Sequence, residues 1–174
     1  MKTRSLLLAL IAGAVIALAV GAVACGGGEE LTLEEYFQKL VDIDKQHEAE
    51  AQPLRDQLNA SLNGLGDEIE VPAGVRDALR SLVASQDNVG KALSDLTPPA
   101  EAKDAHKEAA ASITAEGEAL AKVIGQLDDA KTVGDLNHLF EGDEITKADE
   151  RRSTACVALQ QIATDNAIQA DLNC

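Results

Sequence analysis

The 174-residue chain carries 30 acidic and 15 basic residues, a formal net charge of −15 at pH 7. Such a surface argues against nucleic acid as a partner, because its phosphates require Lys and Arg. It favours cationic partners instead. The chain has no Trp, and Tyr36, Phe37 and Phe140 are its only aromatic residues. This scarcity argues against carbohydrate or flat-ring ligands, for which aromatic faces usually supply much of the contact.

The first 24 residues have the composition of a secretory signal. Lys2 and Arg4 form a short basic region, and residues 6–23 are an uninterrupted apolar run ending in small residues. Signal peptides combine a basic start, an apolar stretch and a small-residue cleavage site. We therefore predict that residues 1–24 are a signal peptide and that Cys25 follows the cleavage site.

The segment Ala22-Val23-Ala24-Cys25 resembles a bacterial lipobox, although Ala22 stands where Leu is commonest. The resemblance implies that the thiol of Cys25 receives a diacylglycerol, with acyl chains such as palmitate. Several acyl chains on one residue give stable anchoring. Residues 25–31 are then the lipidated cysteine and a flexible Gly/Glu tether. This predicts a lipid anchor on the extracytoplasmic face of the cell membrane, or in an outer membrane if the envelope has one.

Two alternatives remain for the same segment. The apolar run is about long enough to stay in the membrane as an uncleaved helix. It could also be an ordinary secretory signal whose product is released. Removal of residues 1–24 takes away Lys2 and Arg4 but no acid, so the mature charge would be −17.

Apolar residues recur at helical spacing from residue 32 onward. Thr32 and Glu35 form a T-x-x-E capping box, and Pro53 is expected to kink the first helix. Further helices are expected from Pro72 to Leu96 and, opened by Pro98 and Pro99, through Leu127. A short helix near 135–140 and a last one over 145–164 follow. With no convincing strand, residues 32–174 are predicted to form an all-α ectodomain, an antiparallel bundle of about four helices with a short extended C-terminal tail.

Cys156 and Cys174 remain after lipidation, and an exported protein is expected to pair them. One continuous helix would hold the two sulfurs far beyond bonding distance. The pairing therefore predicts a helix end at 164–166 and a tail that folds back along the helix.

The three histidines are the residues with the clearest ligand chemistry. Two Asp-x-x-His pairs place a carboxylate and an imidazole one helical turn apart, and bundle metal sites combine such groups from facing helices. The candidate metal ligands are Asp44, His47, His106, Glu116, Asp135 and His138. A partly buried structural histidine is the competing interpretation.

No catalytic or cofactor motif is found: G-x-S-x-G, H-E-x-x-H, a P-loop and C-x-x-C-H are all absent. We therefore expect no enzyme activity and no cofactor. The favoured function is a lipid-anchored binding or interaction lipoprotein with an unknown protein or small-molecule partner. A metal- or cofactor-binding bundle and a structural envelope protein are the alternatives.

Three short stretches, residues 32–37, 96–101 and 155–160, together with the final Cys174, resemble a group of small bacterial lipoproteins. The resemblance implies an anchored, Ala-rich helical ectodomain with a C-terminal cysteine pair. It implies no activity and no binding residue.

Overall fold

The computed structural model describes residues 31–174. The predicted signal peptide, Cys25 and the tether up to residue 30 lie outside the described residues. The described part contains five helices: α2 (Leu33–Leu62), α3 (Val75–Ser94), α4 (Lys103–Gln126), α5 (Val133–Phe140) and α6 (Asp143–Asp165). It contains no strand, and a single bridge between Glu70 and Thr132 links two loops. The predicted all-α class is confirmed.

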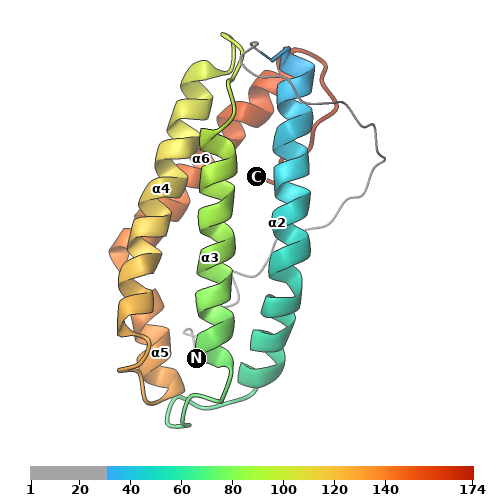
Figure 1. Ribbon diagram of the computed structural model, residues 1–174. Helices are drawn as coiled ribbons and strands as arrows, with labels where there is room; N and C mark the ends of the chain where they lie inside the picture. The colour runs from blue at the N-terminus through green and yellow to red at the C-terminus, as the bar shows by residue number, and fades with distance from the viewer. Residues whose placement is uncertain (1–30) are drawn as a thin grey trace.

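The four long helices run alternately up and down, with α3 beside both α2 and α4, and α4 beside α6 (Figure 1). The short α5 lies at the end of the bundle where α4 ends and α6 begins. None of the helices in residues 31–174 has the length and apolar character needed to cross a membrane.

Local sequence signals define α2. The Thr32 side chain accepts a hydrogen bond from the Glu35 backbone N–H, and the Glu35 carboxylate accepts one from the Thr32 N–H, which completes the predicted capping box. The helix continues through Pro53 and ends at Leu62. Gly64 then adopts φ +81°, a left-handed conformation that glycine tolerates at a helix end.

The start of α4 differs from the prediction. The helix begins at Lys103, and Pro98 and Pro99 belong to the preceding loop. The Ala102 N–H donates to the carbonyl of Pro99, which forms a turn before the helix. Pro99 is buried, so the proline pair closes the α3–α4 connection instead of opening α4.

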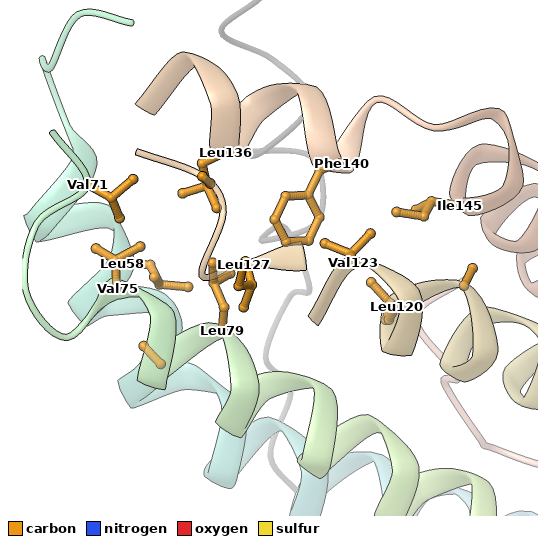
Figure 2. Close-up of a cluster of buried hydrophobic side chains, with 13 residues drawn as sticks. Leu58, Val71, Val75, Leu79, Leu120, Val123, Leu127, Leu136, Phe140 and Ile145 are labelled. Atoms are coloured by element: carbon orange, nitrogen blue, oxygen red, sulfur yellow. The ribbon is translucent and has the colours of Figure 1, made fainter. Parts of the chain in front are cut away.

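One apolar cluster fills the α5 end of the bundle and contains residues of all five helices and of the loops between them, with Ile145 contributed by α6. Leu136 and Phe140 of α5 point toward Val123 of α4 and toward Leu127, the residue that follows α4 (Figure 2). Both α5 residues are buried, so this short helix closes the end of the core.

A second apolar cluster fills the opposite end, where α2 begins and α6 ends. Tyr36 and Phe37 are fully buried in it, and their rings meet edge to face with centroids 5.3 Å apart. Residues 31–174 thus contain two buried apolar clusters and a disulfide, the features of a folded domain.

The C-terminal tail folds back along α6, as predicted. Cys156 and Cys174 are joined by a disulfide with their Cα atoms 5.6 Å apart. The Gln160 amide donates to the Ala170 carbonyl and accepts from the Leu172 N–H. The Asn173 amide reaches Asp44 of α2 at 3.3 Å. The tail therefore lies between α6 and α2, where its apolar side chains pack against the second cluster.

A helix-ending motif reverses the chain into this tail. The Ile168 N–H donates to the Ala163 carbonyl, and the Ala167 N–H donates to the Thr164 carbonyl, the two bonds of a Schellman motif. Ala167 occupies the left-handed position with φ 56°, where glycine is the usual residue.

Ala167→Gly is expected to raise the free energy of unfolding by about 0.5–1 kcal/mol, because the left-handed conformation costs an alanine more than a glycine. Ala158→Gly, on the exposed face of α6, is the matched control and should lower it by a similar amount. Urea denaturation of both variants checks the prediction, and a loss of stability in Ala167→Gly would contradict it.

Candidate functional site

The buried polar residues of the described bundle are Ser85, His106, Ser112 and Glu116. A buried polar group is costly unless it has a hydrogen-bond partner. Each of the four has one in the structure. Three of these groups, with the residues that face them, contain three of the six candidate ligands: His47, His106 and Glu116.

His47 of α2 lies on the apolar stripe of its helix, as predicted, and faces α3. Its Nδ1 atom is 3.0 Å from the hydroxyl of Ser85, and that hydroxyl donates to the Glu50 carboxylate at 3.2 Å. Burial lowers the pKa of His47, and the positive charge of Arg55 lowers it further. Nearby carboxylates raise this pKa, but by less. The group is a polar bridge between α2 and α3.

His106 of α4 is buried against Tyr36 of α2. The Tyr36 hydroxyl lies 3.0 Å from His106 Nδ1, and the two rings meet edge to face. Burial raises the pKa of Tyr36 and lowers the pKa of His106. Both groups are therefore neutral near pH 7, and the phenol can donate its proton to the imidazole nitrogen.

Glu116 of α4 is the most deeply buried carboxylate among the described residues. Only 4% of its side chain is exposed, against 43% for its partner Arg152 of α6, whose Nε atom lies 3.0 Å away. Gln86 of α3 donates a second bond to the same carboxylate oxygen. Burial raises the pKa of Glu116, and Arg152 offsets only part of this shift. The carboxylate therefore connects three helices.

The remaining candidates lie at the surface. Asp135 caps α5, accepting hydrogen bonds from the backbone N–H groups of Lys131 and Thr132, and these bonds lower the pKa of its carboxyl group. His138 lies 3.1 Å from Glu141 at the end of the same helix. Both therefore belong to the local structure of α5.

The structure does not assemble the candidate metal ligands. Asp44 contacts the C-terminal tail, and each histidine has a different partner. Within residues 31–174, no group of three or more His, Cys, Asp or Glu side chains is arranged to hold a metal ion. What the arrangement does chemically is to satisfy buried polar groups across helix interfaces.

Ser85 has a second partner besides His47. The Glu50 carboxylate can only accept, so its hydrogen bond uses the single proton of the Ser85 hydroxyl, and the Ser85 oxygen then accepts from His47 when the imidazole carries its proton on Nδ1. In a catalytic arrangement the imidazole would take the proton of the hydroxyl. The three residues therefore act as a structural link between helices.

Four partners were missed from the sequence: Tyr36, Ser85, Gln86 and Arg152. Ser85 does carry a signal, because it falls at helical spacing between the apolar Leu82 and Val89. A serine at such a position implies a partner on a facing helix. Arg152 carries no comparable signal, since its pairing with Glu116 depends on how α6 lies against α4.

Comparison with protein-family models, with curated proteins and with solved structures finds no match to this chain. Its function is therefore argued from its own residues.

The buried Glu116 gives a prediction about pH. Because the folded protein holds the Glu116 proton more tightly than the unfolded chain does, this residue costs stability as the pH rises above 4.5. Glu116→Gln removes that titration. The unfolding free energy of the variant minus that of the wild type is expected to be larger at pH 7 than at pH 4.

Urea denaturation at the two pH values measures this difference. Glu118→Gln on the same helix is the control, because Glu118 is exposed, and it should change little between the two conditions. A Glu116→Gln difference that is the same at pH 4 and pH 7 would contradict the assignment of a destabilised buried carboxylate.

Proposed function

We propose that this protein is a lipid-anchored, extracytoplasmic interaction protein whose helical domain binds a partner at the membrane surface. The observation that carries the proposal is Cys25, placed after an apolar run and small residues in the pattern of a lipobox. The order of these features, a basic start, an apolar stretch and then a cysteine, supports a cleaved and lipidated N-terminus over a retained helix.

The described domain supports an interaction role over catalysis. Its buried ionisable groups Glu116, His106 and Tyr36 are each engaged in contacts between helices. The surface is acidic, with net charge −15 for the chain, and such a surface attracts basic partners. Buried polar groups that are paired between helices, together with a charged exterior, suit a domain that binds a partner through its surface.

The test compares the full-length wild type with Cys25→Ser in a bacterial host. The wild type should enter the membrane fraction and become labelled by a fatty-acid analogue, whereas Cys25→Ser should remain unlabelled. Cross-linking on intact cells should then give discrete adducts with the anchored wild type. Equal fatty-acid labelling of Cys25→Ser would reject the anchor, and turnover of a substrate by the purified domain would reject the interaction role.

A further inference from the structure

An open groove of about 550 Å³ lies on the outer face of the bundle where α4 and α6 pack together. Its lining includes three alanines, Ala105 of α4 and Ala155 and Ala158 of α6. Alanines from both helices contribute apolar surface with short side chains. Small residues of this kind allow another backbone to approach closely.

The charged residues of the groove are mainly acidic. Asp104 and Glu108 come from α4 and Glu150 from α6, and all three are exposed. The single base, Arg151, lies 4.0 Å from Glu108 and balances only one of these carboxylates. The groove therefore combines an apolar floor with a net negative rim.

An exposed apolar side chain extends this surface along α6. Val157 is 54% exposed, one of two large hydrophobic residues so exposed in the described part of the chain. It follows Glu150 by seven residues and Thr154 by three, spacings that place all three on one face of the helix. Apolar contact is thus available beside the groove as well as within it.

We propose that this groove binds a basic amphipathic helix of a protein partner, a proposal that rests on the interaction role given above. The apolar stripe of the helix lies on the alanines and Val157, and its Lys or Arg side chains pair with Asp104, Glu108 and Glu150. A second copy of this chain would bring a further acidic surface and be repelled. The open shape would leave a small molecule largely exposed to water.

The test uses residues 26–174 and a labelled helical peptide of about 20 residues with Leu and Ala on one face and Lys on the other. Two control peptides carry Glu in place of Lys or the same residues in scrambled order. Fluorescence anisotropy should show binding of the basic amphipathic peptide, with at least about tenfold weaker binding of both controls.

Charge reversal at the groove, Glu108→Lys with Glu150→Lys, should weaken binding by about tenfold or more. The matched control is Glu68→Lys with Asp129→Lys, which makes the same change of net charge at exposed positions in the loops beside α5. This control should weaken binding by less than about threefold, because salt screens distant charges. Ala158→Phe should also weaken binding, since it fills the groove at an exposed position without changing the charge.

Equal loss in the two charge-reversed proteins would mean diffuse electrostatic attraction and overturn the proposal, as would unchanged binding by Ala158→Phe. Circular dichroism and thermal unfolding of each variant establish that the fold is retained. The cross-linking test remains separate from this one. Discrete cellular adducts without peptide binding would reject the groove and leave the interaction role standing, whereas their absence would reject the interaction role itself.

Discussion

Phe37→Ala should lower the free energy of unfolding by about 3–5 kcal/mol, the largest effect expected from a single substitution in the described core. Phe37 is fully buried in the cluster where α2 begins and α6 ends. Truncation removes its apolar area from that cluster and leaves a cavity that rigid helices can fill only in part. Urea denaturation followed by circular dichroism measures the loss.

Val157→Ala is the control for this substitution. Because Val157 is 54% exposed, its truncation should change the unfolding free energy by no more than about 0.5 kcal/mol. Phe37→Leu should fall between the two, since it keeps part of the apolar volume. If Phe37→Ala cost no more than Val157→Ala, the burial of Phe37 in the second apolar cluster would be contradicted.

Removal of the disulfide should have the second largest effect. Cys156 and Cys174 are separated by 18 residues, and closing a loop of this length stabilises a fold by roughly 3 kcal/mol in the chain-entropy model. The double variant Cys156→Ser/Cys174→Ser should lose about this amount. The tail should also become more mobile than the rest of the domain. Without the disulfide, its hydrogen bonds to α6 and α2 are those of Gln160 and Asn173.

Two measurements check this prediction. Urea denaturation of the double variant gives the change in stability, and chemical reduction of the wild type should reproduce it. Hydrogen exchange should show faster exchange of the Leu172 amide, which donates to Gln160 in the folded protein. An unchanged midpoint together with an unchanged Leu172 exchange rate would show that the tail is held without the disulfide.

The features predicted correctly from the sequence depend on residues close together in the chain. The capping box at Thr32, the helix end near residues 164–166 and the return of the tail all follow from local patterns or from the Cys156–Cys174 spacing. The start of α4 was placed too early. Proline is favoured in the first helical turn, but Pro99 is buried in the α3–α4 connection.

The polar contacts could be predicted only in part. Helical spacing placed His47 on the apolar stripe, yet its partner Ser85 is 38 residues away on another helix. The pairing of Glu116 with Arg152 likewise depends on the alignment of α4 and α6. A helical pattern shows which face is buried, whereas the packing of neighbouring helices decides which residues meet.

We propose that a lipid on Cys25 holds the helical domain at the membrane. Mass spectrometry of the N-terminal peptide, taken from full-length protein extracted from membranes, checks this anchor. We expect a chain that begins at residue 25 and carries diacylglycerol on the Cys25 sulfur. A chain that retains residues 1–24, or a Cys25 with an unmodified thiol, would contradict it.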